Sequence, residues 1–286
     1  FFQADDGIRD SVASRGLGDV YKRQVPPGVP SDILGLEFAG VVLEAGERVF
    51  GMAQGDRVFG LLGGGGYASR TITHHRMAIP IPDGWDFVQA AATPEVYFTA
   101  YDALFNRGSL EMGERLLVHA AGSGVGTAAG QLAHHAGAFV IGTASSSEKL
   151  ARATELGMDV GINYHEQDFA AMVKEATGGV GVDHVLEVGG DGTMERSIRA
   201  TAKGGNIAVV GDLSGRLSEL NSDEHQIRMS AIIVGSRSMM EQLLRAITLH
   251  SRTPVIDRIF PFAKLREALA YLEQGWHFGK VVIKYD

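Results

Sequence analysis

The second half of the chain alternates between short apolar runs and longer stretches of helical period. The apolar runs are typical of buried strands, and the stretches between them carry apolar positions three and four residues apart. This alternation predicts an α/β fold in which a doubly wound parallel sheet is covered by helices on both faces. We expect strands at 116–120, 139–143, 160–162, 183–188, 206–211 and 231–235, and helices at 127–136, 147–156, 166–177 and 193–202.

The first half of the chain has a different pattern, with short strands separated by glycine turns. Strands are predicted at 38–44, 56–60 and 67–72, with a turn at 63–66, and together they suggest a small β-rich unit. Helical stretches follow at 87–92 and 95–105. After the predicted parallel sheet, the pattern gives helices at 239–250 and 263–274 and strands at 255–260 and 280–285.

Residues 1–24 show no sustained period of two or 3.6. They resemble the non-native ends of some translated metagenomic reads, so we expect them to take no part in the fold. The alternative is a genuine disordered tail.

Composition and charge narrow the class of protein. The chain has 286 residues, of which 45% are hydrophobic and 21% charged, as in ordinary globular proteins of one or two domains. The formal net charge of -8 argues against nucleic acid or an anionic membrane as the main partner. The absence of cysteine excludes disulfides, a thiol nucleophile and cysteine-bound zinc. With no apolar run long enough for a bilayer and no secretory pattern, we expect a cytoplasmic protein.

A glycine-rich turn joins the predicted strand at 116–120 to the helix at 127–136. Glycines in such a turn let backbone N–H groups approach a pyrophosphate, and the positive end of the following helix attracts it. The predicted dinucleotide-binding residues are Gly122, Ser123, Gly124, Val125 and Gly126. The alternative is a structural loop in an α/β protein that binds no nucleotide.

Several motifs, taken in order, resemble the medium-chain dehydrogenase/reductase superfamily, with the zinc-free quinone-oxidoreductase-like branch closest. They lie at 35–42, 55–60, 90–101, 120–126, 156–164, 254–262 and 277–283. The resemblance implies a partial GroES-like catalytic domain at 25–92, a Rossmann dinucleotide-binding domain at 93–246, and a return to the catalytic domain at 247–286.

Two departures from that family pattern affect the expected chemistry. The strands that normally precede residue 27 are missing, which indicates an N-terminally truncated product whose activity is in doubt. Zinc-using relatives have a histidine ligand where this chain has Leu36, which has no donor atom. We therefore expect no metal.

The end of the strand at 139–143 bears on the choice of cofactor. NAD-specific Rossmann folds place a carboxylate about 20 residues after the glycine turn, and none stands at this strand tip. Ser145 and Lys149 suit a phosphate group, and the resemblance implies that Lys149 and Tyr164 flank the adenosine phosphate. This favours NADPH over NADH. The alternative is a serine helix cap beside a solvated lysine.

Other cofactor contacts follow from position or from the resemblance. Val188 and Gly189 follow one strand and Gly211 follows the next, where ligands of parallel sheets bind. The resemblance implies that Thr99 lies near the nicotinamide carboxamide and that Lys280 contacts the cofactor. Each of these could instead be an ordinary turn or helix residue.

The predicted function is NADPH-dependent hydride transfer, without metal, to a quinone or an α,β-unsaturated carbonyl substrate. No catalytic residue is assigned; Tyr67 and Tyr97 are possible proton donors, although both suit a core position. The alternatives are an NAD(P)-dependent alcohol dehydrogenase and a catalytically silent NADPH-binding protein. The apolar strand at 231–235 should form the edge of the Rossmann sheet, and the resemblance implies a homodimer through it.

Overall fold

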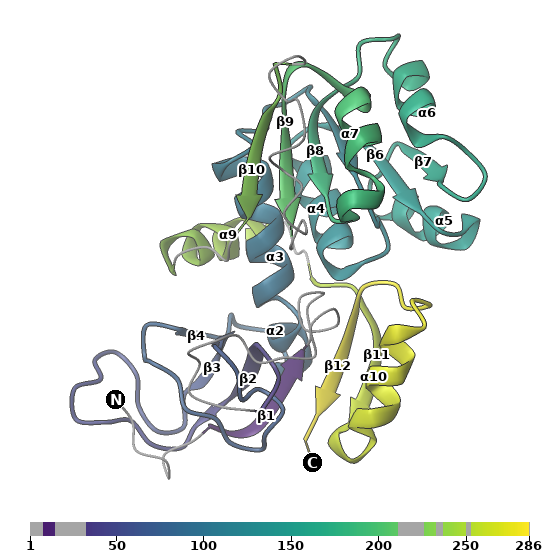
Figure 1. The fold of residues 1–286 in the computed structure, drawn as a ribbon. Helices are drawn as coiled ribbons and strands as arrows, with labels where there is room; N and C mark the ends of the chain where they lie inside the picture. The colour runs from purple at the N-terminus through teal and green to yellow at the C-terminus, as the bar shows by residue number, and fades with distance from the viewer. Residues whose placement is uncertain (1–7, 15–32, 211–225, 233–236, 250–252, 286) are drawn as a thin grey trace. The chain divides into compact units, whose positions relative to one another are not determined.

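The computed structural model describes residues 8–14, 33–210, 226–232, 237–249 and 253–285 (Figure 1). The chain divides into two compact units, one formed by Phe1–Val96 with Ser236–Asp286 and the other by Tyr97–Gly235. The helix α9 (Arg237–Leu249) groups with the first unit, and α3 (Pro94–Tyr101) spans the change from one unit to the other. The domain boundaries expected at 93 and 247 stay predictions.

The second unit is built on a parallel sheet of six strands in the order β10-β9-β8-β5-β6-β7. This is the strand order of a Rossmann fold, in which the order of the strands along the sequence reverses between β5 and β8. Buried apolar residues fill the central strands because helices cover both faces. The strands are β5 (Arg115–Val118), β6 (Phe139–Ala144), β7 (Val160–Asn163), β8 (Val182–Glu187), β9 (Thr201–Val210) and β10 (Arg228–Ile232).

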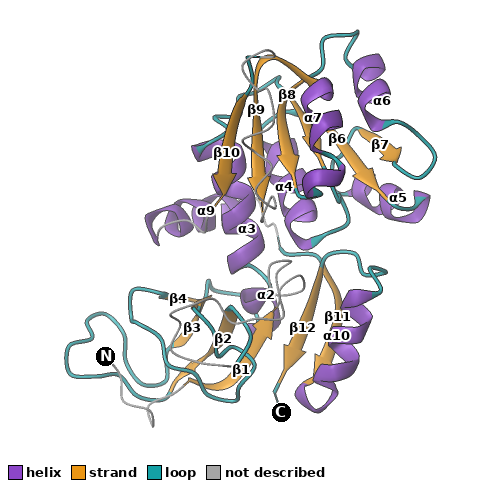
Figure 2. Ribbon diagram, viewed as in Figure 1, coloured by secondary structure: helices purple, strands orange, loops and turns teal. Residues whose placement is uncertain are grey.

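Helices connect these strands and cover both faces of the sheet (Figure 2). Helices α6 and α7 lie side by side on one face, where Phe169 and Ile198 join a core with Leu117 and Ile207 of the sheet. Helix α4 covers the opposite face. Ser123, Ser146 and Asp168 cap the helices α4, α5 and α6 with their side chains, which fixes where each helix begins. The helices are α4 (Gly124–His135), α5 (Ser147–Glu155), α6 (Phe169–Ala176) and α7 (Met194–Ala200), with a short 3-10 turn η2 (Gly190–Gly192) before the last.

The first unit contains a second six-stranded sheet, in the order β11-β12-β1-β2-β3-β4. Its neighbouring strands are antiparallel except for the parallel pair β11 and β12. The strands are β1 (Ile8–Ser14), β2 (Glu37–Val42), β3 (Arg57–Leu61), β4 (Ala78–Pro80), β11 (Ile256–Pro261) and β12 (Lys280–Lys284), and the remaining helical elements are α2 (Phe87–Ala91), η4 (Phe262–Lys264) and α10 (Leu265–Glu273).

The expectation that residues 1–24 lie outside the fold is wrong for β1. In β1, Val12 pairs with Ala39 of β2 on one side and with Lys284 of β12 on the other. The strand therefore joins two parts of the sheet that are far apart in the sequence. The period of a seven-residue segment contains no information about such distant partners.

The expected strand at 67–72 is also wrong. The backbone around it bonds to a loop instead of a strand, with Tyr67 N donating to Leu34 O at 2.9 Å and Gly66 N to Gly35 O at 2.9 Å. The Tyr67 side chain packs with Ala268 and Val281 in a buried cluster. The apolar residue that suggested a strand is thus buried by tertiary packing.

Several other elements differ in extent from the prediction, including the two that follow. The predicted helix at 95–105 is α3 followed by the π-helical segment η1 (Asp102–Asn106). The predicted strand at 231–235 is β10, which begins three residues earlier, and residues 233–235 lie outside the described part of the chain.

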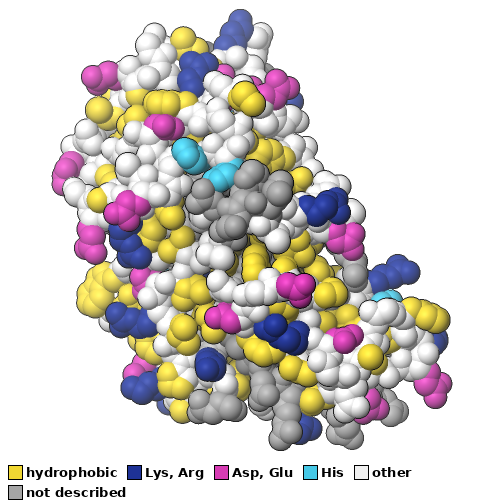
Figure 3. Space-filling view, turned by 180° about the vertical axis from the view of Figure 1, so that it is seen from behind, with side chains coloured by type: hydrophobic (Ala, Val, Ile, Leu, Met, Phe, Trp, Pro, Cys, Tyr) yellow, Lys and Arg dark blue, Asp and Glu magenta, His cyan; other side chains and the backbone are white. Residues whose placement is uncertain are grey.

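Charged and apolar side chains are mixed on the face of the molecule that Figure 3 shows. In the view of Figure 3, acidic and basic side chains are interspersed with apolar ones, with no large patch of one sign on that face of the described residues. Within the described part of the chain, no helix is both long and apolar enough to cross a bilayer.

Candidate cofactor-binding site

The carboxyl ends of β5, β6, β7 and β8 meet at one edge of the parallel sheet. Ligands of open α/β sheets bind at this edge, beside the point where the strand order reverses. Four loops begin there, and they contain most of the predicted contacts.

The loop after β5 has the geometry of a phosphate-binding turn. Ala120 adopts a left-handed conformation with φ of 48°, and Ser123 caps α4, its Oγ accepting from Gly126 N at 3.0 Å. Helix α4 begins at Gly124, three residues before the predicted start, so Gly124, Val125 and Gly126 form its first turn. The first N–H groups of a helix have no carbonyl partner within it. Ser123 accepts from Gly126 N, so the N–H groups of Gly124 and Val125 are the ones at the helix start that an anion would meet.

The structure gives a different reason for glycine at position 126 from the one expected from the sequence. Its backbone is not left-handed, and an added Cβ would collide with the carbonyl oxygen of Ala120. Gly126 thus allows the helix to start close beneath the turn, rather than allowing the turn itself. The same close packing brings Ala121 N to within 2.8 Å of Thr143 O on β6.

The predicted adenosine-phosphate residues lie at two adjacent strand ends. Ala144 of β6 pairs with Asn163 of β7, so Ser145 and Tyr164 are the next residues of neighbouring strands. The backbone N of Tyr164 donates to Ala144 O at 3.2 Å, and the residue is 42% exposed. Lys149 lies in the first turn of α5, where its backbone N donates to Ser146 Oγ at 3.3 Å. The capping alternative therefore applies to Ser146, while Ser145 has no such role.

The turn after β8 is fixed by a buried carboxylate. Glu187, the last residue of β8, accepts a hydrogen bond from Gly189 N at 2.7 Å and another from Thr193 Oγ1 at 2.7 Å. A Cβ on Gly189 would lie 2.5 Å from Thr193 Oγ1, so a residue with a side chain at position 189 would require the turn or Thr193 to shift. Val188 and Gly189 thus hold a defined position at the predicted ribose site.

Glu187 also ends a buried polar network that sequence reasoning missed. His119 lies between Thr143 Oγ1 at 3.0 Å from Nδ1 and Ser197 Oγ at 2.9 Å from Nε2, and Ser197 donates to Glu187 Oε2 at 2.6 Å. All four side chains are buried. The available signal was polar residues at the ends of apolar strands, but their partners lie on other elements.

The environment of His119 favours its neutral form. Burial lowers the pKa of His119, Glu187 acts in the opposite direction, and the charge of Arg196 adds to the lowering. The ring also packs edge-on against Phe169, with 4.7 Å between centroids. A neutral imidazole donates from one nitrogen and accepts at the other, which matches its two hydroxyl partners.

The remaining predicted contacts have mixed outcomes. Thr99 is buried on α3, and Tyr97 on the same helix is a core residue whose hydroxyl accepts from Gln131 Nε2 at 3.2 Å. Gly211 lies outside the described residues. The roles of Thr99 and Gly211 therefore stay predictions.

Lys280 has a partner that the sequence did not indicate. It is buried at the start of β12, and its Nζ lies 2.6 Å from Glu37 Oε2 in a fully enclosed ion pair. The other oxygen of Glu37 accepts from Glu95 N at 2.8 Å. This pair gives Lys280 a structural role in the first unit, and contact with a cofactor remains only a prediction.

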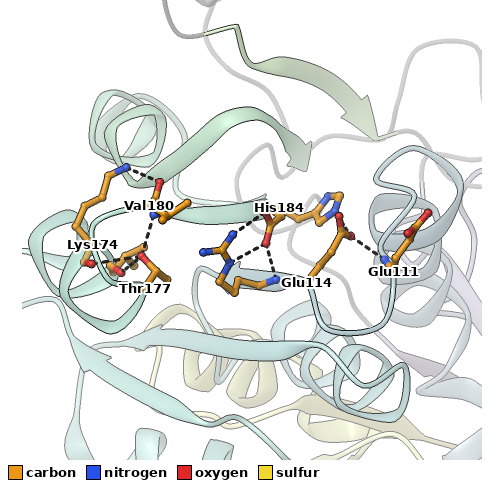
Figure 4. A network of polar contacts seen from close by, with 10 residues as sticks. Glu111, Glu114, Lys174, Thr177, Val180 and His184 are labelled. Atoms are coloured by element: carbon orange, nitrogen blue, oxygen red, sulfur yellow. Dashed lines mark hydrogen bonds and ion pairs between the residues drawn. The ribbon is translucent and has the colours of Figure 1, made fainter.

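Charged groups also gather at the opposite end of the parallel sheet (Figure 4). Arg115 forms two side-chain bonds to Asp183, at 2.9 and 3.0 Å, and His184 Nε2 lies 2.8 Å from Glu114. Burial alone would raise the pKa of Asp183, but the hydrogen bonds and charge of Arg115 outweigh it and lower that pKa overall. This network joins the amino ends of β5 and β8, away from the predicted cofactor residues.

A hollow of about 730 Å³ lies beside the helices α6 and α7 and the start of β9. No predicted cofactor residue lines it. The Lys174 amine on its wall donates to Val180 O at 3.0 Å, as Figure 4 shows. The lining residues are Asp168, Ala170, Ala171, Lys174, Val180, Ile198, Arg199, Thr201 and Lys203.

The residues present do not fit a catalytic zinc of the family type. Leu36, which precedes β2, has no donor atom, and the sequence has no cysteine. Among the residues that the structure describes, no group of three or more histidine or acidic side chains is arranged to hold a metal ion.

Two family models match the chain. The model described as alcohol dehydrogenase GroES-like domain matches residues 8–83, which includes β1, and the model described as zinc-binding dehydrogenase matches residues 124–248.

Two curated relatives illustrate the range of similar proteins. A zinc-type alcohol dehydrogenase-like protein of Schizosaccharomyces pombe is 33% identical over 97% of this chain and 87% of its own length. The spectinabilin polyketide synthase system protein NorB of Streptomyces orinoci is 36% identical over 87% of this chain. The chain spans only 12% of the length of NorB.

Three solved structures share the fold over 98% of this chain and 91% of their own chains. An NAD-dependent alcohol dehydrogenase has a TM-score of 0.89 at 31% identity. The CurK enoyl reductase has a TM-score of 0.86 at 26% identity, and a mycobacterial protein complexed with NADPH has 0.89 at 26%.

Proposed function

Because the chain belongs to the medium-chain dehydrogenase/reductase superfamily, and is thus an oxidoreductase of that type, we propose that it transfers hydride from NADPH to a quinone or an α,β-unsaturated carbonyl. The observation that carries the cofactor choice is the pair of strand ends at Ser145 and Tyr164, with Lys149 in the first turn of α5. Glu148, the nearest carboxylate on α5, is exposed in the same turn, and no acidic residue ends β6.

Each loop at this edge has a separate task in holding the dinucleotide. The first turn of α4 offers backbone N–H groups to the pyrophosphate, and the Lys149 amine with the Ser145 hydroxyl binds the 2′-phosphate. Val188 and Gly189 receive the nicotinamide ribose, and Thr99 lies near the carboxamide. The bound nicotinamide supplies the hydride, and the protein supplies position and polarity.

The substrate class follows from the absence of a ligand side chain at Leu36. A carbonyl that is not polarised by a metal must be polarised by hydrogen-bond donors or water. Quinones and enones tolerate this because their reduced anions are delocalised, whereas the oxidation of a simple alcohol gains more from a metal. Similarity to the CurK enoyl reductase and to a polyketide synthase protein supports this class.

The test of the cofactor proposal is calorimetry with NADPH and NADH on the Lys149→Ala variant. Removal of the amine should weaken NADPH binding about tenfold and leave NADH nearly unchanged. Lys203→Ala is the control, because Lys203 is exposed on β9 and lies outside the predicted site. Equal losses for the two nucleotides would refute the phosphate assignment.

An alcohol dehydrogenase is the second candidate, favoured by the 31% identity to an NAD-dependent alcohol dehydrogenase. A panel of alcohols, quinones and enones assayed with both nucleotides separates the two. NAD-dependent oxidation of alcohols with no reduction of enones would replace the first proposal. The third candidate, a catalytically silent protein, depends on the strands expected to be missing before residue 27. The presence of β1 in the sheet weakens that argument.

We propose further that two copies associate through β10. This strand ends the sheet order and pairs with β9 on one side, and Ala231 on it is exposed. An isologous pairing of two such edges would satisfy their backbone groups. Ala231→Lys places like charges at that interface and should give a monomer by light scattering. A wild-type protein that is already monomeric at micromolar concentration would contradict the proposal.

A further inference from the structure

One buried network at the cofactor edge has no part in the proposed contacts. It contains Thr143 of β6, His119 directly after β5, Ser197 of α7 and Glu187 of β8. We infer that this chain of hydrogen bonds is a positioning network, which presets the turn at Val188 and Gly189 for the nicotinamide ribose. This inference rests on the proposed dinucleotide function and assigns these residues a role within it.

Glu187 is the member of the network that bonds directly to the ribose turn. Its carboxylate is fully buried and accepts three hydrogen bonds, from Gly189 N, Thr193 Oγ1 and Ser197 Oγ. A carboxylate offers about four acceptor sites, and these three donors occupy most of them. The bond to Gly189 N is the one that acts directly on the predicted ribose turn.

The Ser197 hydroxyl determines the direction of the other hydrogen bonds in the network. Ser197 has one hydroxyl proton, and it donates this proton to Glu187. Its Oγ therefore accepts from His119 Nε2–H, and the other nitrogen, Nδ1, accepts from the Thr143 hydroxyl. The network thus specifies the Nε2–H tautomer of a neutral imidazole, in agreement with the lowered pKa of His119.

Two members of the network lie directly before the proposed cofactor-binding turns. His119 directly precedes the turn at Ala120, and Glu187 directly precedes Val188. The backbone adds a link between the same strand ends, because His119 N donates to Leu186 O at 3.2 Å. Side-chain and backbone bonds together fix the spacing of the pyrophosphate turn and the ribose turn.

Stability alone does not account for such a network. Burying a carboxylate costs desolvation energy, and apolar residues of similar volume often stabilise a fold as well or better. What an apolar residue at 187 cannot supply is an acceptor for the N–H of Gly189. The geometry of the turn is therefore the property that we expect the network to protect.

The decisive variants are Glu187→Leu and Glu187→Gln. Leucine removes every acceptor. Glutamine keeps a carbonyl oxygen for Gly189 N and Thr193, and its amide can donate to Ser197, which then donates to His119 Nε2. The hydrogen bonds in the glutamine variant run in the reverse direction, and His119 changes to the Nδ1–H tautomer.

The measurements are dissociation constants for NADPH and for adenosine 2′,5′-bisphosphate, which has only the adenosine end. Glu187→Leu should weaken NADPH binding about tenfold and the bisphosphate less than about twofold, and Glu187→Gln should restore NADPH affinity. The histidine ¹⁵N shifts should report Nε2–H in the wild type and Nδ1–H in Glu187→Gln. A merely structural role would not move the tautomer.

Equal weakening of the two ligands, no weakening of either, or an unchanged His119 tautomer would overturn the inference. If Glu187→Leu does not fold, Ser197→Ala interrupts the hydrogen-bond network by removing a single oxygen atom. The affinities of this variant for NADPH and for the bisphosphate are then compared in the same way. If the wild type binds no bisphosphate, the NADPH assignment fails separately, and NADH with ADP replaces the ligand pair.

Discussion

The two ends of the parallel sheet hold polar groups in contrasting ways. At the carboxyl ends, Glu187 and His119 are almost completely buried and bonded to hydroxyl and backbone groups. At the amino ends, Arg115 and Asp183 form a bidentate ion pair whose side chains are each about a quarter exposed, at 28% and 26%. The polar groups at the carboxyl ends are held by neutral hydrogen-bond donors in the buried interior. Those at the amino ends are held by opposite charges that are partly exposed to solvent.

This difference shows what each end contributes. An ion pair that reaches solvent adds little stability and tolerates small movements of its long side chains. A buried network with every group satisfied permits few alternative geometries. The rigid end is the one where a dinucleotide must find its loops in place.

The largest expected effect comes from Gly126, which packs the carboxyl-end loop against its helix. Gly126→Ala places a Cβ against Ala120 O, so the turn or the helix must shift. We expect a loss of about 1–3 kcal/mol in unfolding free energy and at least about a tenfold loss of NADPH affinity. Urea denaturation and calorimetry measure the two.

Gly192→Ala is the matched control for this variant. An added Cβ there meets no atom within 4 Å, so both properties should stay close to the wild type. An unaffected Gly126→Ala protein would show that the packing of α4 under the turn is not required.

The next effect is the pH dependence that His119 gives to the carboxyl end. Its pKa is lowered in the folded protein, so the unfolded chain binds more protons below about pH 6.5. The stability contributed by neutral His119 is therefore present above that pH and falls as the pH drops, by at most about 1.4 kcal/mol per unit.

His119→Gln isolates this contribution, because the glutamine amide can still donate to Ser197 while it does not titrate. Unfolding free energies measured between pH 7.5 and 5.5 should fall less steeply in the variant. Equal slopes would mean that His119 titrates alike in the folded and unfolded chains.

The smallest effect is expected at the amino end. Asp183→Asn should reduce the unfolding free energy at pH 7 by about 1 kcal/mol, since the pair is partly exposed. The folded pKa of Asp183 is lowered, so its contribution is present above about pH 4 and is lost as the pH falls further. NADPH affinity should not change.

Urea unfolding at pH 7 and pH 3.5 checks this prediction, and the difference between wild type and variant should shrink at the lower pH. A large loss of NADPH affinity in Asp183→Asn would break the contrast between the two ends of the sheet.

The sequence by itself determined the features that depend on local pattern. The alternation of apolar runs and helical periods gave the parallel sheet, and the glycines after residue 121 marked the turn before α4. The apolar run before Ser145 indicated a strand that ends beside it, whereas the role expected of Tyr164 came from the family resemblance. These properties are visible because the residues that decide them are neighbours in the chain.

The tertiary structure decided what depends on distant partners. His119 and Ser197 are 78 residues apart, and Glu37 and Lys280 are 243 apart, so no local period predicts their bonds. Strand β1 joins the fold only because β2 and β12 offer it two edges, and Tyr67 leaves the expected strand because α10 and β12 bury it. Backbone pairing and burial are settled by the whole fold, since each polar group must find its partner wherever the chain supplies one.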